Sequence, residues 1–228
     1  MSVVDHAVSR ITKAQPECAF DSVETAIAAV RRGEFVLVVD DESRENEGDL
    51  IIAANAVTPE AMAFMVRHTS GVVCISLPGN VLDRLELPPM VTNNAEPFRT
   101  AFAVSVDLRL GVSTGISAAD RAATLRALAD PAAKADDFVR PGHIFPLRSR
   151  PGGVLERPGH TEAAQDLVSL AGRSVGGVLC ELVNDDGSMA RQADLIAFAL
   201  SHDIAIISIA DLISYRQLQN QSAYGVQA

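Results

Sequence analysis

The chain has 228 residues, of which 48% are hydrophobic, and its formal net charge at pH 7 is -10. A chain of this length buries roughly 70% of the surface that it exposes when unfolded, so it forms a core without cross-links. The acidic balance argues against nucleic acids and anionic membranes as partners, because both require basic surface patches. The three cysteines, Cys18, Cys74 and Cys180, lack the spacing of a disulfide framework or a structural zinc site.

The N-terminus predicts an intracellular protein. Residues 1–17 contain acidic and polar residues where a signal peptide would have an uninterrupted apolar stretch, and no 18 apolar residues run together anywhere. Scattered, odd-numbered cysteines fit a reducing compartment. We therefore expect a soluble, cytoplasmic protein.

Segments typical of helices and strands alternate along the chain, without a repeat or a low-complexity linker. Residues 21–33 predict a helix, since a Ser/Asp cap and early acids precede late arginines and a terminal glycine. The later predictions are, in chain order, strands at 35–39 and 50–54, a helix at 58–69, a strand at 71–77, an irregular loop at 87–100, a strand at 101–108, helices at 117–131 and 161–172, a strand at 177–183, a helix at 188–202 and a strand at 204–209. One domain of mixed α and β structure is the simplest interpretation.

The predicted loop at residues 40–49 carries six acidic side chains and one arginine. Glu45, Glu47 and Asp49 are spaced at two, and in an extended segment this spacing places all three carboxylates on one face. Two interpretations remain open, a solvated acidic loop and a site for a hard cation such as Mg2+, which takes oxygen ligands. From the spacing alone, the solvated loop is the simpler of the two.

The sequence RPGH occurs twice, at residues 140–143 and 157–160. Pro-Gly is typical of a turn, so each copy is expected to present an arginine and a histidine at a tight bend, away from any packed helix face. His143 and His160 are therefore candidate functional residues. Thr161 is a candidate N-cap of the next helix, whose first amide groups offer a phosphate-binding position.

Three further positions suit chemistry but also have structural explanations. Arg157 would add positive charge at the phosphate position, whereas Glu162 in the first helical turn would repel an anion or simply stabilise the helix dipole. The stretch at 111–117, GVSTGIS, offers hydroxyl and amide donors but matches no nucleotide-binding fingerprint. Glu181 lies near the end of a buried strand, either in contact with solvent or as a carboxylate with a shifted pKa and a catalytic task.

Eight segments, spread over nearly the whole chain, carry a resemblance to a known family when they are taken together. They are DDESRENEGDLIIAA, RHTSGVVCISL, TAFAVSVD, GVSTGISAADRAATLRALAD, RPGHIFPL, RPGHTEAAQDLVSLAG, GVLCELVNDDGSMAR and DLISYR. In this order they resemble the 3,4-dihydroxy-2-butanone 4-phosphate synthases of riboflavin biosynthesis. The resemblance implies an α+β fold, a single-domain sandwich of a mixed β-sheet with helices packed on it. That domain would span residues 1–228, with a core of about 18–217 and flexible ends. Because the chain ends soon after DLISYR, we expect no fused GTP cyclohydrolase II domain.

The resemblance also implies an activity, which is the Mg2+-dependent conversion of D-ribulose 5-phosphate to 3,4-dihydroxy-2-butanone 4-phosphate and formate. It makes Glu45 and His160 the metal ligands, with Mn2+ as a substitute ion and two ions per site as an option. The substrate-binding residues that it implies are Arg44, Glu45, Asp49, Arg157, Gly159, His160, Thr161 and Glu181. Its implied catalytic residues are His143, Glu181 and Asp49, and Glu47, Cys74 and Thr114 would line the site.

Two positions depart from the family pattern, and several features stay open. Pro158 replaces a small residue and removes one backbone donor beside the phosphate position, and Ser113 stands where threonine is usual. The family forms homodimers with active sites at the interface, so we expect a homodimer that binds a phosphosugar. The alternatives are a phosphosugar-binding regulator without turnover and a metal-dependent pentose-phosphate isomerase or aldolase.

Overall fold

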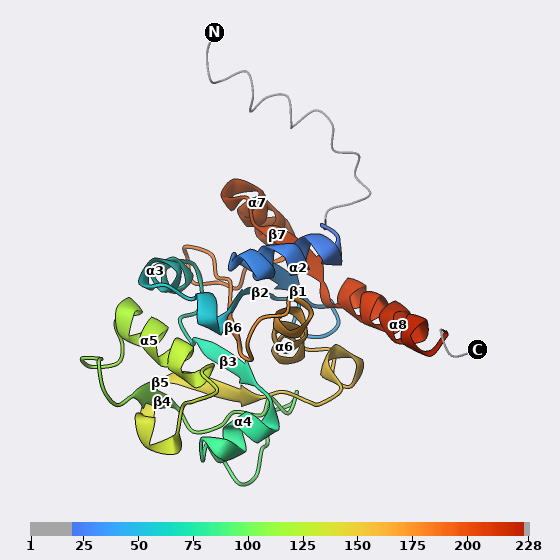
Figure 1. Cartoon of the computed structure of the whole chain (residues 1–228). Helices are drawn as coiled ribbons and strands as arrows, with labels where there is room; N and C mark the ends of the chain where they lie inside the picture. Colours follow the sequence, from blue (N-terminus) through green and yellow to red (C-terminus); the bar gives the residue numbers. More distant parts are fainter. Residues whose placement is uncertain (1–19, 226–228) are drawn as a thin grey trace.

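The computed structural model describes residues 20–225, so the predicted flexible N-terminal end and Cys18 lie outside the described residues. A seven-stranded sheet crosses the molecule in the order β4-β5-β3-β6-β2-β1-β7, with parallel and antiparallel pairs (Figure 1). The strands are β1 (Val36–Val39), β2 (Gly48–Ala53), β3 (Cys74–Leu77), β4 (Val106–Leu108), β5 (Phe138–Arg148), β6 (Gly177–Glu181) and β7 (Ala205–Ser208). The α-helices are α2 (Val23–Arg32), α3 (Pro59–His68), α4 (Gly79–Arg84), α5 (Ala118–Leu128), α6 (His160–Leu170), α7 (Gln192–His202) and α8 (Ile209–Gly225).

Helices cover both faces of the sheet, because the central strands are apolar on both sides. On β2, Leu50 and Ile52 pack into a core with α3, α4, α5 and α7, whereas Ile51 and Ala53 pack into a second core with α2, α6 and α8. This alternation follows from the period of two along a strand. The predicted α+β sandwich with a mixed sheet is confirmed.

Local capping signals in the sequence produce the helix boundaries that they predict. The Ser22 hydroxyl accepts a hydrogen bond from the Thr25 amide at the start of α2, and Gly33 ends this helix in the left-handed conformation at φ 83°. Thr58 and Ser117 cap α3 and α5 in the same way as Ser22. Residues 87–100 contain no helix and no extended strand, as expected from their prolines and asparagines.

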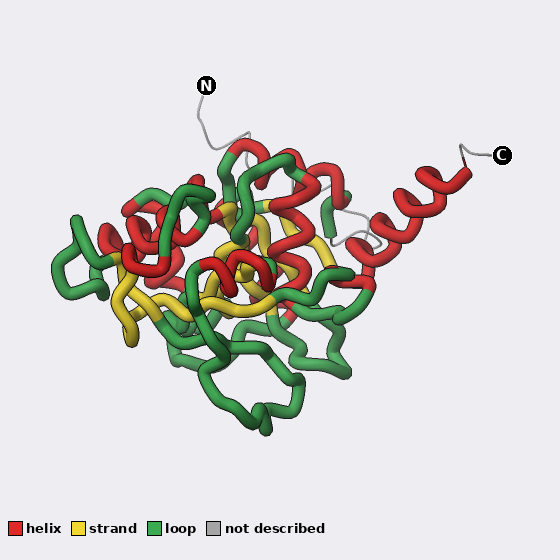
Figure 2. The backbone as a smooth tube through the Cα atoms, turned by 60° about the horizontal axis from the view of Figure 1, so that its bottom comes forward, coloured by secondary structure: helices red, strands yellow, loops and turns green. Residues whose placement is uncertain are grey.

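Other boundaries differ from the prediction. The strand expected at 101–108 is regular only in β4, because Phe102 and Ala103 form isolated bridges instead. Two helices were not predicted. Helix α4 is too short to show an apolar period, and α8 has a largely polar sequence and extends away from the body of the molecule (Figure 2).

The expectation of a bend in each RPGH copy is wrong for the first copy, whereas the second copy bends at Gly159 but does not lie away from a packed helix. The first copy lies within β5 and contains a cis peptide between Arg140 and Pro141. A Cβ atom on Gly142 would lie 2.0 Å from the Val106 backbone, so glycine allows the close approach of β4. In the second copy Gly159 is the N-cap of α6, two residues before the predicted Thr161, and the buried His160 begins the packed helix.

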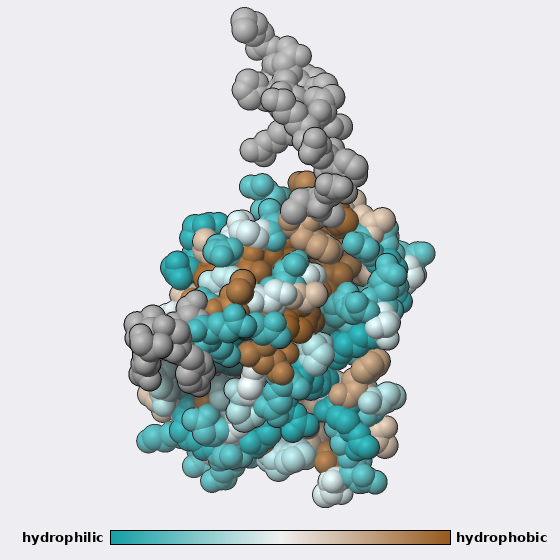
Figure 3. Space-filling view, turned by 90° about the vertical axis from the view of Figure 1, so that its right-hand side faces the viewer, coloured by the Kyte–Doolittle hydropathy of each residue, from teal (hydrophilic) through white to brown (hydrophobic). Residues whose placement is uncertain are grey.

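The surface is largely hydrophilic, in keeping with the charge of the chain. On the face shown in Figure 3, hydrophobic residues gather in the upper half of the described surface, and the lower half is mainly hydrophilic. Within residues 20–225, no helix combines the length and the apolar character that crossing a membrane requires.

Candidate active site

Three neighbouring strands present polar side chains to the N-terminus of α6. Asp49 on β2 lies directly opposite Glu181 on β6, and Cys74 begins the adjacent β3. Strand alternation places Asp49 on the face of Ile51, which packs against α6. The side chains therefore meet His160, the first residue of α6, at one end of the sheet.

The acidic loop between β1 and β2 is organised by Asp40 rather than extended. The Asp40 carboxylate accepts hydrogen bonds from the amides of Glu45 at 3.0 Å and Glu47 at 2.8 Å, and from the Arg44 guanidinium at 2.9 Å. Residues 42–45 form a turn, and Asn46 has a φ of 54°. The predicted extended geometry is thus wrong for this loop.

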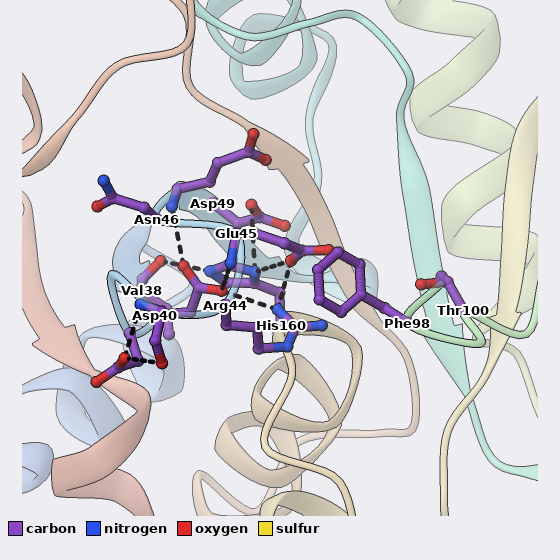
Figure 4. A network of polar contacts seen from close by, with 12 residues as sticks. Val38, Asp40, Arg44, Glu45, Asn46, Asp49, Phe98, Thr100 and His160 are labelled. Carbon is purple, nitrogen blue, oxygen red and sulfur yellow. Dashed lines mark hydrogen bonds and ion pairs between the residues drawn. The ribbon is translucent and has the colours of Figure 1, made fainter. Parts of the chain in front are cut away.

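His160 has a defined orientation above the strands. Its Nε2 atom lies 3.1 Å from the carbonyl oxygen of Val38, which only accepts hydrogen bonds, so Nε2 carries the hydrogen. The Nδ1 atom lies 3.6 Å from Glu45 Oε2 and 3.8 Å from Asp49 Oδ1 (Figure 4). The ring nitrogen that faces the carboxylates is therefore the one whose lone pair is available to a cation.

Burial and mutual charge shift the pKa values in this cluster. Burial alone would lower the pKa of His160, but the negative charges of Asp49, Glu45 and Asp40 outweigh it and raise the pKa to about 9. Burial raises the pKa of Asp49 to about 8, against the opposing effect of His160. Burial also raises the pKa of Glu47, and the nearby charges of Glu45 and Glu181 add to this shift. Without a cation, the cluster therefore holds protons that isolated side chains would release.

Three side chains are placed to hold a metal ion together. One ligand atom from each of Asp40, Glu45 and His160 lies within 4.8 Å of the others. Glu45 and His160 were predicted as metal ligands, whereas Asp40 was not. Its position directly after a buried strand was the sequence signal that could have indicated it. Asp49 Oδ1 lies beside this cluster, buried and without a hydrogen-bond partner within residues 20–225.

Two arginines converge at the N-terminus of α6. A Cβ atom on Gly159 would lie 2.5 Å from Arg157 Nη1 and 3.1 Å from Arg44 Nη2, so glycine leaves space for both guanidinium groups. Arg157 donates to Glu162 Oε2 at 2.7 Å, and Glu162 is almost fully buried. The Glu162 carboxylate is therefore paired with this arginine, which reduces the repulsion of an anion expected from the sequence.

Most of these side chains line one pocket of about 230 Å3, whereas Asp40 and Glu162 lie outside its wall. The predicted site residues on its wall are Arg44, Glu45, Glu47, Asp49, Cys74, Arg157, His160, Thr161 and Glu181. Gly159 borders it through the contacts with the two arginines. The structure thus brings together most of the predicted site, from segments that are far apart in the sequence.

His143 and Thr114 do not line this pocket. The side chain of His143 is 41% exposed, and its Nδ1 atom lies 2.6 Å from Asp107 Oδ2. Gly115, next to Thr114, packs against both groups of this pair. The two predicted residues therefore lie near each other at a second location.

Several residues in or beside the pocket were not predicted from the sequence. Ser70 donates a hydrogen bond of 2.6 Å to Glu181 Oε2 and so orients a predicted catalytic carboxylate. From the irregular loop, Thr100 accepts a hydrogen bond from Arg157, and the Phe98 ring lies 5.0 Å from the Arg44 guanidinium (Figure 4). No local sequence pattern pointed to these contacts, because they depend on how the loop folds back.

Proteins similar to this chain in sequence and in fold identify its family. Residues 24–215 match the family model described as 3,4-dihydroxy-2-butanone 4-phosphate synthase. The chain belongs to this family. The 3,4-dihydroxy-2-butanone 4-phosphate synthase of Cronobacter sakazakii (strain ATCC BAA-894) is 56% identical over 205 residues, which cover 90% of this chain and 94% of that protein.

Two further comparisons extend this result. The riboflavin biosynthesis protein RibBA of Nocardia farcinica is 58% identical over 200 residues, or 87% of this chain and 48% of RibBA, so the chain spans about half of that relative. A crystal structure of 3,4-dihydroxy-2-butanone 4-phosphate synthase in complex with two magnesium ions has a TM-score of 0.86 and 46% identity, covering 88% of this chain and 99% of the other. The predicted family, fold and enzyme class are confirmed.

Proposed function

We propose that this protein converts D-ribulose 5-phosphate to 3,4-dihydroxy-2-butanone 4-phosphate and formate, a step of riboflavin biosynthesis. The observation that carries the proposal is one pocket that combines Glu45 and His160 of the candidate metal cluster with two arginines and further acidic side chains. Membership of the synthase family supports this assignment.

The donor set fits Mg2+. Two carboxylates and an imidazole converge, the Nδ1 lone pair of His160 faces them, and the buried Asp49 Oδ1 has no hydrogen-bond partner within residues 20–225. We assign Glu45 and His160 as ligands, with Asp40 as a third. When bound, Mg2+ supplies positive charge that stabilises an enediolate oxygen of the substrate. Mn2+ suits the same donors, and the solved relative with two magnesium ions supports the option of two ions per site.

The arginine end of the pocket suits the sugar phosphate. Arg157 and Arg44 supply charge-assisted donors, and the first amides of α6 and the Thr161 hydroxyl add neutral ones. Arg157 is held by Glu162 and Thr100, so it is oriented before substrate arrives. Pro158 has no amide hydrogen, and the Gly159 amide donates to the Arg157 carbonyl at 2.9 Å, so we assign the phosphate contacts to the His160 and Thr161 amides.

The carboxylates between these two ends are placed to move protons. We assign Glu181, which is oriented by Ser70, as the base for the C3 proton of the substrate, with Asp49 as the second candidate. The pKa of Asp49, raised to about 8, allows this residue to donate or accept a proton near neutral pH. Loss of water from C1, migration of a carbon-carbon bond and hydrolytic release of C4 as formate all require such transfers.

We further propose a homodimer in which His143 and Thr114 complete the site of the neighbouring subunit. Three features support this arrangement: both residues lie outside the pocket of their own subunit, His143 is partly exposed, and no hydrogen bond or ion pair within residues 20–225 involves its Nε2 atom. The cytoplasmic location and the single-domain organisation stay predictions from the sequence.

Formate release from D-ribulose 5-phosphate, measured with and without Mg2+, tests the proposed reaction. The synthase reaction predicts one formate for each sugar phosphate consumed, and only when the divalent ion is present. An isomerase or aldolase would consume the substrate without formate, and a binding regulator would not consume it. Either result would contradict the proposal.

A further inference from the structure

Asp107 on β4 holds His143 on β5 through two separate contacts. Its Oδ1 atom accepts a hydrogen bond of 2.9 Å from the His143 backbone amide, and its Oδ2 atom lies 2.6 Å from the ring Nδ1 atom. The two strands are adjacent at one edge of the sheet (Figure 1). One carboxylate thus fixes both the backbone and the ring of this histidine.

The contact determines which ring nitrogen carries the hydrogen. An ionised carboxylate only accepts hydrogen bonds, so the Nδ1 atom of His143 must donate to Asp107. In the neutral ring, Nε2 is then unprotonated. Within residues 20–225 no hydrogen bond or ion pair involves Nε2, so it is available to a proton donor outside this subunit's described structure.

Gly115 packs closely against the pair. A Cβ atom on Gly115 would lie 2.0 Å from Asp107 Oδ2 and 2.8 Å from His143 Nδ1, and Gly115 has a φ of 89°. The Asp120 carboxylate accepts hydrogen bonds from the Ser113 hydroxyl at 2.7 Å and from the Gly115 amide at 3.1 Å, which fixes this loop. Glycine at 115 is therefore required by both the backbone conformation and the close approach.

Positive charge faces the pair from α5. Arg121 is buried and interacts electrostatically with Asp107, while no hydrogen bond or ion pair involves its guanidinium within residues 20–225. This positive charge lies beside the carboxylate that holds His143. The other charged group of the surrounding loop, Asp120, is occupied by Ser113 and Gly115.

We propose that Asp107 is a positioning residue, which holds His143 with hydrogen on Nδ1 and a free Nε2 that acts as the proton acceptor. The inference rests on the proposed function, in which His143 takes part in the reaction. Glu181 removes the C3 proton, whereas Nε2 takes a hydroxyl proton of the substrate, which produces an imidazolium paired with Asp107; the same proton then passes to the C1 oxygen that leaves as water. No net proton is gained or lost by the pair.

Nitrogen-15 NMR of the full-length protein tests the orientation directly, with His143→Gln used to assign the His143 signals. In the wild type we expect Nδ1 to be protonated and Nε2 to be unprotonated when the ring is neutral. In Asp107→Asn the side-chain oxygen should keep the His143 amide contact, so its NH2 group faces Nδ1 and the ring hydrogen moves to Nε2. The opposite tautomer in the wild type, or an unchanged tautomer in Asp107→Asn, would overturn the proposal.

Kinetics separate a positioning role from a structural one. Asp107→Asn should lower kcat for formate release by roughly 100-fold or more with a much smaller change in KM, while Asp107→Glu, which keeps an acceptor, should recover part of the loss. The exposed Asp136→Asn is the matched control and should behave as the wild type. Equal activity of wild type and Asp107→Asn would overturn the proposal. A wild type that releases no formate would instead contradict the proposed reaction, and the NMR result would still decide the orientation of His143.

Discussion

The Nδ1 atom of His160 faces Asp49 Oδ1 at 3.8 Å, and this oxygen is buried without a hydrogen-bond partner within residues 20–225. Buried carboxylate oxygens are rarely left in this state, because the lost hydration is not replaced. A cation beside Glu45 and Asp40 would compensate for the negative charge of the cluster. A cation at this position would explain how the loop at residues 40–49 can contain six acidic residues.

Substitution of a proposed ligand distinguishes its role in Mg2+ binding from its contribution to the negative charge of the loop. Glu45→Gln is expected to weaken Mg2+ binding by roughly 10- to 100-fold or more and to lower kcat, because it removes a charged ligand. The control is Glu42→Gln, which removes the same charge from an exposed position of the same loop. Calorimetric Mg2+ titration and formate assays measure both effects. Equal Mg2+ affinity in the two variants would show that Glu45 is not a ligand.

Arg157 is expected to contribute to both phosphate binding and the stability of the fold. Arg157→Ala should raise KM more than it lowers kcat, through loss of a charge-assisted contact worth about 1.5 to 3 kcal/mol. It also leaves Glu162 buried without its partner, which should destabilise the fold by up to about 3 to 5 kcal/mol.

The double variant Arg157→Ala/Glu162→Gln distinguishes these contributions. Removing the buried charge should recover part of the lost unfolding free energy in chemical denaturation, while KM stays high. Recovery of KM together with stability would show that Arg157 acts only through the structure.

The buried thiol of Cys180 predicts a loss of stability at alkaline pH. Burial raises the pKa of Cys180 from 9.0 to about 11, and the charge of Glu181 adds to this shift. A folded-state pKa above the unfolded value stabilises the protein fully below about pH 9, and this contribution is lost as pH rises to about 11. Cys180→Ala should reduce the slope of unfolding free energy against pH between these values. An identical slope would contradict this account of the thiol.

Mixed dimers test whether the sites are shared. Glu45→Gln and His143→Ala should each be inactive, but their mixture should regain part of the activity, because one site of each mixed dimer then contains both intact residues. Subunit exchange is verified by native mass spectrometry. No recovery after verified exchange would show that each site is built from one chain.

Sequence patterns predicted the parts of this protein that depend on local physics. The caps at Ser22, Thr58 and Ser117 and the apolar strand runs produced the expected elements. Family resemblance, rather than spacing, selected the pocket residues, since the extended geometry expected for Glu45 and Glu47 is wrong. Asp40 and Asp107 were missed because their roles depend on contacts made after folding.

The same reason explains the errors at the RPGH segments. A Pro-Gly pair is typical of a turn, yet Gly142 accommodates a neighbouring strand and Gly159 accommodates two arginines. Both requirements come from tertiary contacts that no local window contains. In α8 the residues that pack on the core, such as Ile209 and Leu212, are confined to the first two turns, and the polar remainder lacks the apolar period by which a helix is recognised.

The most direct test of the central claim follows one carbon atom. D-Ribulose 5-phosphate labelled with carbon-13 at C4 is incubated with the full-length protein and Mg2+, and the products are observed by carbon-13 NMR. We expect the label to appear in formate, in a one-to-one ratio with unlabelled 3,4-dihydroxy-2-butanone 4-phosphate, and chelation of Mg2+ to stop the reaction. Label retained in a five-carbon product, or substrate left unchanged with Mg2+ present, would contradict the proposed function.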